Sequence, residues 1–204
     1  MSSLNLAGVF TDALQEHLSI IRQLESQQDA FERAAILITD SLLRGNKVLW
    51  CGNGGSAADS QHLAAELVGR FHHPRAALAS IALTTNTSVL TAVANDFGYE
   101  EVFQRQVEAL CQRGDVVVGM STSGNSRNVY TALRKARDLQ AATVVMTGNN
   151  GTGMAALADV CIRVPSQDAA RVQEAHILFG HMLCQWVELA TCINHAVANG
   201  GSGQ

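Results

Sequence analysis

The sequence is poor in several features that mark whole classes of protein. It has two prolines and 5% aromatic residues among 204, and its 17 glycines follow no three-residue period, which excludes collagen-like and low-complexity chains. No apolar run reaches the length of a membrane span, and the first residues lack the basic and apolar parts of a secretory signal. The net charge of −4 gives no general basic surface, so we expect neither a membrane partner nor direct nucleic-acid binding.

The cysteines do not form a recognisable network. Their number is odd and their spacings match no zinc or redox motif. A chain of this length buries a sizeable core without disulfides. We therefore predict reduced, mostly buried thiols and a cytoplasmic protein. The five residues are Cys51, Cys111, Cys161, Cys184 and Cys192.

Short apolar runs alternate with helical patterns along most of the chain. Residues 1–45 carry two amphipathic helical stripes, and a last helix is predicted over 169–195. Apolar strands separated by helices indicate one doubly wound α/β domain, with a parallel sheet covered on both faces. Further helices are predicted over 56–67 and 101–112, and two more end near 95 and near 139. The predicted strands are 47–51, 80–83, 115–120, 142–146 and 160–164.

This pattern divides the chain into three parts of one structural unit. Residues 1–45 form an N-terminal helical arm, 46–195 the α/β domain, and 196–204 a disordered tail. The first stripe of the arm has no obvious partner strand, and we expect it to pack against other subunits, with packing on its own sheet as the alternative. That stripe consists of Leu14, Leu18, Ile21 and Leu24.

Two loops of small polar residues follow predicted strands, where doubly wound sheets bind their ligands. In the first, CGNGGS at 51–56, small residues let backbone N–H groups approach an anion, and Ser56 is expected to cap the next helix. Its spacing matches neither a dinucleotide fingerprint nor a Walker A motif, and a plain strand-to-helix turn is the alternative.

The second loop, STSGNS at 121–126, carries four hydroxyls in six residues. We expect Ser121, Ser123 and Ser126 to converge on one phosphate together with backbone N–H groups of the loop. An ordinary helix cap is the alternative, but one cap needs only one hydroxyl.

Taken together, the two loops resemble the sugar isomerase (SIS) family of phosphosugar-binding domains. Four longer segments, CGNGGSAADSQHLAAELVGRF, ANDFGYEEVF, GDVVVGMSTSGNS and ARVQEAHILFGHMLC, are similar in the same order to bacterial phosphoheptose isomerases. The resemblance covers the chain up to its tail. It implies a flavodoxin-like three-layer αβα sandwich with a five-stranded parallel sheet, and a homotetramer with active sites between subunits.

The resemblance also implies an activity. Members convert D-sedoheptulose 7-phosphate to D-glycero-D-manno-heptose 7-phosphate, an aldose–ketose isomerisation early in ADP-heptose biosynthesis. Whether the product feeds lipopolysaccharide, capsule or another glycan, and which anomer is released, depends on more than this sequence.

Roles for individual side chains follow from the same resemblance. The cluster that matches the catalytic and zinc-binding residues, with one zinc per subunit, is His62, Glu66, Gln173 and His181. Some members of the family carry a His and an Asp at the positions of Ala57 and Ala170, which leaves any role at these positions open. Substrate-binding roles fall on Asn53, Gly54, Ser56, Glu66, Arg70, Asp96, Ser121, Thr122, Ser123, Ser126 and Gln173.

The chemistry suits these residue types. Moving a proton between C1 and C2 through an enediol needs a base, an acid for the oxygens and a group that holds developing charge. We assign Glu66 as the base and His181 as the acid. Zinc would polarise the oxygens, although a carboxylate bound to zinc is a poorer base and Gln is an uncommon ligand. Whether Glu66 acts as base or mainly as metal ligand stays open.

One spacing within this cluster is informative. Gln173 and His181 are eight residues apart on one predicted helix, roughly 12 Å along its axis and about 80° apart in direction. A straight helix barely brings both to one zinc, so either Gln173 precedes the helix proper or the two residues serve neighbouring sites. We favour a site between subunits, with Glu66 and His181 from different chains.

Two other functions compete with catalysis. A relative of the family is a non-enzymatic tetramer that binds the bacterial replication initiator, and it lacks the counterparts of Glu66 and His181. A sugar-phosphate-sensing domain of a regulator is the third possibility, and it is disfavoured because no DNA-binding segment flanks the domain. The presence of both Glu66 and His181 favours an enzyme.

Overall fold

The computed structural model describes residues 5–200, with side chains as far as Ile193. Five strands, all parallel, form one sheet in the order β2-β1-β3-β4-β5. This is the strand order of flavodoxin-like folds, and it confirms the predicted three-layer α/β architecture. The strands are β1 (Val48–Gly52), β2 (Ser80–Ala82), β3 (Val116–Ser121), β4 (Ala142–Thr147) and β5 (Val160–Arg163).

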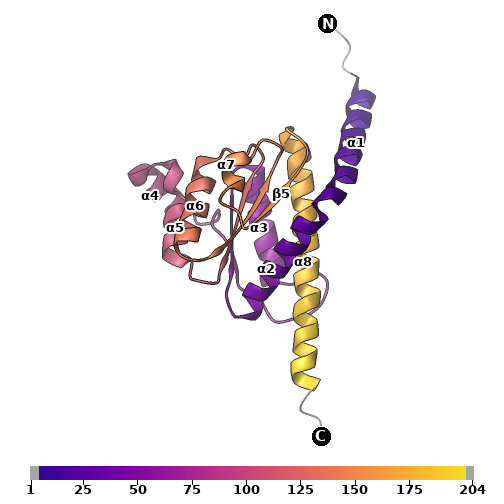
Figure 1. The fold of residues 1–204 in the computed structure, drawn as a ribbon. Helices are drawn as coiled ribbons and strands as arrows, with labels where there is room; N and C mark the ends of the chain where they lie inside the picture. Colours follow the sequence, from indigo (N-terminus) through magenta and orange to yellow (C-terminus); the bar gives the residue numbers. More distant parts are fainter. Residues whose placement is uncertain (1–4, 201–204) are drawn as a thin grey trace.

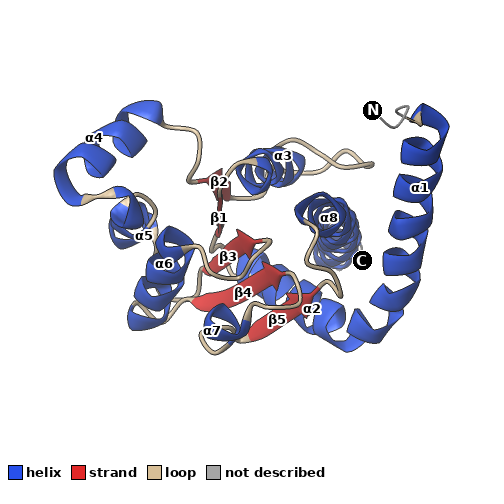
Figure 2. Cartoon of the chain, turned by 90° about the horizontal axis from the view of Figure 1, so that it is seen from above, coloured by secondary structure: helices blue, strands red, loops and turns tan. Residues whose placement is uncertain are grey.

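Helices cover both faces of the sheet (Figure 2). Side chains alternate along each strand, so that Val48 and Trp50 face one side while Leu49 and Cys51 face the other. The first face packs against α2 (Gln28–Leu43), α3 (Gly55–Val68) and α8 (Ala169–Gly200). The second packs against α4 (Thr87–Phe97), α5 (Gln104–Leu110), α6 (Arg127–Asp138) and α7 (Thr152–Ala155).

The predicted strands end within one residue of the observed ones, and larger differences occur at three helices. The helix expected over 101–112 is divided into a 3-10 turn, η2 (Tyr99–Glu101), and α5, with a turn at Val102 and Phe103 between them. The short α7 was not predicted, since four residues leave no periodic pattern. The last helix continues to Gly200, because Ala196 and Ala198 favour helix and the glycine run begins only afterwards.

The structure corrects the predicted tail but does not test the predicted arm. Residues 196–200 are helical, which corrects part of the predicted disordered tail, and 201–204 lie outside the described residues. The division of the chain into arm and domain remains a prediction.

The arm begins with α1 (Leu6–Gln23), which has no buried residue and projects past the sheet beside α8 (Figure 1). The 3-10 turn η1 (Leu24–Gln27) joins it to α2. Polar contacts hold α1 to α8: His17 Nδ1 lies 2.7 Å from Glu174 Oε2, and Arg171 donates to the carbonyl of Ala13 at 2.7 Å.

The predicted stripe of the arm is split by this arrangement. Leu24 is buried and Ile21 packs on the chain's own core, whereas Leu14 and Leu18 are 49% and 52% exposed. All five cysteines are free, as predicted, and burial raises the pKa of Cys51 to about 12. Among the described residues, no helix is long and apolar enough to cross a bilayer.

Candidate active site

Two loops meet where the strand order reverses. Strands β1 and β3 are neighbours in register, with Gly52 beside Met120, so the loops that follow them start side by side. Their connections leave in opposite directions across the sheet, which makes this the switch point where doubly wound folds bind ligands. The sequence-predicted polar loops therefore lie at one edge.

A pair of amides joins these loops. Asn53 donates to Asn128 Oδ1 at 2.9 Å, and Asn128 donates back to Asn53 Oδ1 at 2.8 Å. The hydroxyl of Tyr99 also donates to Asn53 Oδ1, at 3.2 Å. Asn128 is buried and its Oδ1 accepts the N–H of Val129, so the first loop is fixed to the start of α6.

The first loop uses its glycines for close approach. Gly54 has φ +58°, and a Cβ on Gly55 would lie 2.5 Å from Nε2 of Gln173. The prediction that Ser56 caps α3 is wrong, because the helix begins at Gly55 with Gly54 as its N-cap. Ser56 is instead buried inside the first turn, and its N–H donates to the carbonyl of Asn53 at 3.0 Å.

The second loop is held by its own hydroxyls. Ser121 and Ser126 bring their Oγ atoms to 2.8 Å, and Ser121 Oγ accepts the N–H of Gly124 at 3.1 Å. Ser123 is exposed and accepts the N–H of Asn125 at 3.2 Å. Two of the three predicted phosphate ligands are therefore in contact, while Ser123 lies on the outside of the same turn. Thr122 is half-buried between them.

The acid–base candidates meet on α3 and α8. His62 Nε2 lies 2.8 Å from His181 Nε2 and 3.5 Å from Glu66 Oε1. The two imidazole rings are 5.0 Å apart in an edge-on arrangement. Burial and His62 lower the pKa of His181, and Glu66 opposes them. These contacts bring Glu66 and His181 around His62 within one chain, whereas they were expected from different chains. The expectation that the site lies between subunits stays a prediction.

Close packing of the two helices creates this cluster. A Cβ on Gly180 would lie 2.5 Å from both Cδ atoms of Leu63, so only glycine lets α8 approach α3 here. Gln173 lies against Gly55 and His181 against His62, which means that the helices run side by side in the same direction.

Gln173 does not join the cluster. It lies inside α8, so the alternative that it precedes the helix proper is wrong. Its side chain contacts Gly55, seven residues before His62 and roughly 10 Å away along α3. The four predicted zinc ligands are therefore divided into a group of three and a separate glutamine.

The group of three suits zinc in its chemistry. Two imidazoles and a carboxylate are the donors of catalytic zinc sites, which keep an open position. Bond lengths near 2 Å place two tetrahedral ligand atoms about 3.3 Å apart, whereas His62 Nε2 and His181 Nε2 lie 2.8 Å apart. The rings must separate slightly to admit an ion, and within 5–193 no group of three or more His, Cys, Asp or Glu residues stands ready as a metal site.

Two predicted substrate ligands lie elsewhere. Arg70 is exposed in the loop after α3, at the opposite end of that helix from the serine loop. Asp96 is exposed near the end of α4 and accepts a hydrogen bond from Asn95. The chain by itself brings neither side chain to the two loops.

Several residues near the site were not predicted. Asn128 and Tyr99 hold the first loop, and Phe71 stacks near His181 with ring centres 5.7 Å apart. Glu188, one of two carboxylates on α8, is buried and binds the loop after α3. For Glu188 the sequence offered one signal, a glutamate among the apolar positions of the last helix.

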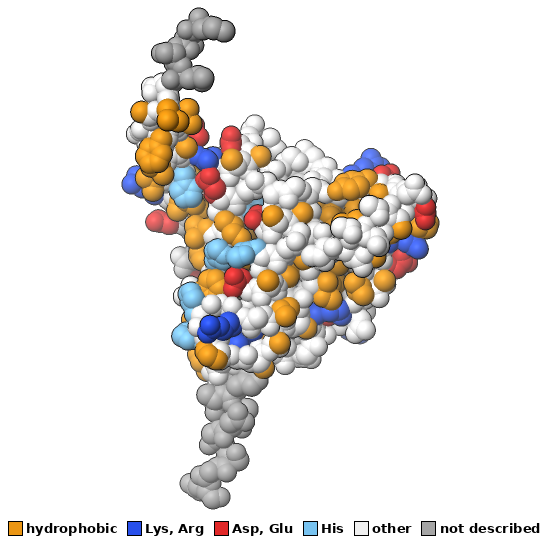
Figure 3. Space-filling model, turned by 180° about the vertical axis from the view of Figure 1, so that it is seen from behind, with side chains coloured by type: hydrophobic (Ala, Val, Ile, Leu, Met, Phe, Trp, Pro, Cys, Tyr) orange, Lys and Arg blue, Asp and Glu red, His pale blue; other side chains and the backbone are white. Residues whose placement is uncertain are grey.

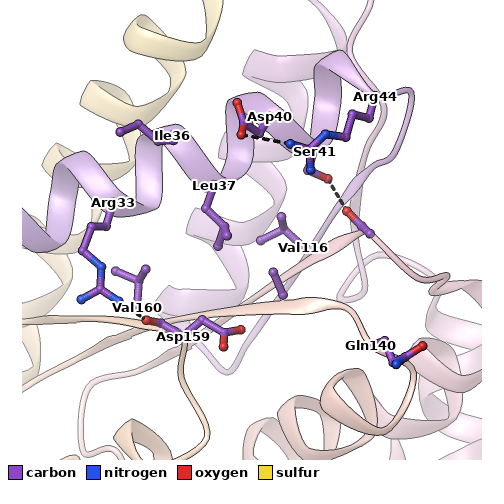
Figure 4. Close-up of a pocket in the computed structure, with 12 residues that line it drawn as sticks. Arg33, Ile36, Leu37, Asp40, Ser41, Arg44, Val116, Gln140, Asp159 and Val160 are labelled. Atoms are coloured by element: carbon purple, nitrogen blue, oxygen red, sulfur yellow. Dashed lines mark hydrogen bonds and ion pairs between the residues drawn. The ribbon is translucent and has the colours of Figure 1, made fainter.

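A cavity of about 390 Å³ lies at the other end of the sheet, under α2 (Figure 4). Several of its polar groups are already engaged: Arg33 donates to the carbonyl of Asp159, Arg44 to Asp40, and Ser41 to the carbonyl of Gly114. It adjoins the amino ends of β3, β4 and β5, away from the edge where such folds bind ligands.

Known proteins match this chain over most of its length. The model of the SIS domain family matches residues 10–148. A phosphoheptose isomerase of Aliarcobacter butzleri is 50% identical over 182 residues, 89% of this chain and 96% of the relative.

Two solved structures show that the similarity extends to the fold. A phosphoheptose isomerase from Neisseria gonorrhoeae is 41% identical with a TM-score of 0.85, covering 90% of this chain and 99% of its own. One from Francisella tularensis is 31% identical with a TM-score of 0.88, covering 91% and 100%. The chain belongs to the SIS domain family and, within it, to the phosphoheptose isomerases.

Proposed function

We propose that the chain isomerises D-sedoheptulose 7-phosphate to D-glycero-D-manno-heptose 7-phosphate. One observation carries this proposal: Glu66 and His181 meet around His62, on the helix that starts at the polar loops of the switch point. Relatives about half identical to this chain are named phosphoheptose isomerases. The enzyme is thus an aldose–ketose isomerase.

The layout suits a long phosphorylated sugar. From Gly55 beside the loops to His62 in the cluster is roughly 10 Å along α3. We propose that Ser121, Ser123 and Ser126 bind the phosphate, with Asn53, Gly54, Ser56 and Thr122 around it, while C1 and C2 reach the cluster. A hydrogen bond to the charged phosphate contributes about 1.5–3 kcal/mol.

Proton transfer then falls to two side chains. Glu66 takes a proton from C1 while His181 donates one to the C2 oxygen, which gives the enediol. Glu66 returns its proton to C2, and the proton of the C1 oxygen passes back to His181. The lowered pKa of His181 makes its protonated ring a stronger acid.

Zinc is part of the proposal. One ion per subunit would be held by His62, Glu66 and His181 and would polarise the sugar oxygens. While they hold the ion, Glu66 and His181 would not be free for the proton transfers described above, so for these two side chains the two roles are alternatives. The donor chemistry supports zinc. Gln173 lies apart from the other three residues of its own chain, so as a fourth ligand it would come from a neighbouring subunit.

We also propose a homotetramer. Exposed apolar side chains run along α1 and α8, and Figure 3 shows hydrophobic atoms gathered on the arm. Such an uncovered stripe is typical of an interface. In the tetramer, Arg70 and Asp96 would reach the substrate of a neighbouring site. The stripe on α8 consists of Leu178, Met182, Trp186, Leu189 and Ile193.

The cytoplasm is the proposed compartment, because all five cysteines are free thiols. The product is proposed to enter ADP-heptose biosynthesis, including that of lipopolysaccharide. The alternative of a non-enzymatic tetramer that binds the replication initiator is not favoured, since Glu66 and His181 are present and in one cluster.

Turnover of sedoheptulose 7-phosphate by the purified chain, with and without a chelator, tests the function. Turnover is expected, and its loss with the chelator, restored by zinc, would support the metal. Absence of turnover in zinc-supplied buffer, together with capture of the replication initiator, would reject the enzyme.

A subunit-mixing experiment tests the place of Gln173. Inactive Gln173→Ala and His181→Gln proteins are dissociated and reassembled together. If Gln173 serves the site of a neighbouring subunit, some mixed sites contain both native residues and activity returns. Verified reassembly without recovery would place Gln173 in the site of its own chain.

A further inference from the structure

The loop between α3 and β2 is built around one buried carboxylate. Glu188, 1% exposed in the middle of α8, accepts the N–H of Phe71 on Oε2 at 2.8 Å. Its Oε1 accepts the N–H groups of His72 and His73, both at 2.7 Å. Three successive backbone donors on one carboxylate form an anion nest. Burial raises the pKa of Glu188, whereas the three N–H donors and Arg75 together lower it by more, so the net shift of the pKa is downward.

Arg75 links Glu188 to the end of α3. Its side chain is 5% exposed, with Nε 3.4 Å from Glu188 Oε2. The guanidinium donates to the carbonyls of Glu66 and Leu67, each at 2.8 Å. These belong to the last turn of the helix, where a cation is favourable. The turn that carries Glu66 is therefore tied to Glu188.

Phe71 links Glu188 to His181 in the acid–base cluster. Its ring centre lies 5.7 Å from that of His181 and 4.1 Å from that of His72. His181 in turn lies 2.8 Å from His62. The position of Phe71 is set by its own N–H bond to Glu188. Glu188 is thus connected to both the proposed base and the proposed acid.

We infer that Glu188 is a positioning residue for the isomerisation, acting through Arg75 on Glu66 and through Phe71 on His181. This inference rests on the proposed function. Glu188 has no route to the substrate, since its carboxylate is enclosed by backbone N–H groups and a guanidinium. Its effect must therefore appear in the rate of proton transfer rather than in binding of the phosphate, which lies at the other end of α3.

The chain offers a matched control for loss of stability. Asp115 is likewise 1% exposed, accepts the N–H groups of Lys47 and Gln112, and pairs with Lys47 Nζ at 2.7 Å. It precedes β3 at the amino edge of the sheet, away from the cluster. Removing the charge of Glu188 leaves the buried Arg75 without its counter-ion, and removing that of Asp115 leaves the partly exposed Lys47 without its own, so both changes destabilise the fold.

The test compares Glu188→Gln with Asp115→Asn in the full chain, by urea unfolding and by turnover of sedoheptulose 7-phosphate. Misplacement of catalytic groups by about 1 Å costs up to roughly 100-fold in rate. We therefore expect kcat of Glu188→Gln to fall by at least about tenfold with KM little changed. Asp115→Asn should lose stability and keep its kcat. An unchanged kcat in folded Glu188→Gln, or an equal loss in Asp115→Asn, would overturn the inference.

A second variant decides the case if Glu188→Gln does not fold. Phe71→Leu keeps an apolar side chain and the N–H bond to Glu188 but loses the ring beside His181. A fall in kcat without a change in KM is expected, and an unchanged kcat would overturn the inference. Wild-type protein without turnover would instead reject the proposed function, and the inference with it.

Discussion

The serine loop and the acid–base cluster are built in different ways. The loop is six consecutive residues whose hydroxyls bond to one another and to their own backbone, as Ser121 does with Ser126 and Gly124. The cluster joins His62 and His181 across 119 positions of the chain and exists only because two helices pack closely. The loop therefore carries its geometry locally, whereas the cluster depends on the fold.

This difference separates binding from chemistry. The loop lies at the start of the site, where the substrate's phosphate is proposed to bind, and the cluster lies two turns along α3. Changes in the loop should act on KM and changes in the cluster on kcat. Variants that mix the two effects would break the comparison.

The largest effect is expected at Glu66. Glu66→Gln removes the proposed base but keeps the size of the side chain, and general base catalysis contributes about 10²- to 10⁴-fold. We expect kcat to fall within that range while KM stays nearly constant, as measured by steady-state kinetics. Glu32→Gln, an exposed position on α2, is the control for loss of a glutamate and should keep full activity. A rise in KM with kcat retained would assign Glu66 to binding.

The next effect is expected in the loop. The double variant Ser121→Ala/Ser123→Ala removes two proposed phosphate donors, and each bond to a charged group contributes about 1.5–3 kcal/mol. KM should rise by at least about tenfold, with a smaller change in kcat. Ser26→Ala, on the exposed η1 turn, serves as the control. An unchanged KM would show that the phosphate binds elsewhere.

How far the sequence predicts each region follows from the same contrast. The alternation of apolar strands and helices predicted the sheet and its two covered faces, and contiguous motifs placed both loops at its edge. The capping role of Ser56 was wrong because the helix begins one residue earlier, at Gly55, with Gly54 as the cap. Local sequence does not decide between neighbouring cap positions when several small residues are adjacent.

Contacts between distant segments were less accessible. The resemblance singled out His62, Glu66 and His181, but not that they meet within one chain, since this depends on the crossing of α3 and α8 at Leu63 and Gly180. Glu188 carries no local motif, because its partners are backbone N–H groups over 100 positions earlier in the chain. Side-chain patterns do not record such bonds.

A third prediction tests that crossing. Gly180→Ala adds a Cβ that would lie 2.5 Å from both Cδ atoms of the fully buried Leu63. Overpacking costs about 1–3 kcal/mol, of which the better helix propensity of Ala returns up to about 1 kcal/mol. Urea unfolding should therefore show a net loss of stability, and kcat should fall as the helices separate.

Two controls sharpen this prediction. In a Leu63→Ala background the added Cβ has room, so Gly180→Ala should become neutral or stabilising by up to about 1 kcal/mol. Gly153→Ala, where a Cβ meets nothing within 4 Å, should not destabilise. Equal costs of Gly180→Ala in both backgrounds would mean that Leu63 does not set the approach of the helices.

The smallest effect concerns His176, which lies on α8 between Gln173 and His181. The side chain is fully buried, and burial lowers its pKa to about 4 from an ordinary value of 6.5. Between these values the unfolded chain binds more protons than the folded one, so stability rises with pH through this window and is lost as pH falls from 6.5 toward 4. At one pKa unit per 1.4 kcal/mol, the stability measured by urea unfolding should fall by about 1.4 kcal/mol between pH 7.5 and pH 5.5.

Two variants test this assignment to His176. His176→Leu should remove this part of the pH dependence, and His73→Gln, at an exposed position, should retain it. The same slope in wild type and His176→Leu would assign the loss of stability in acid to other groups.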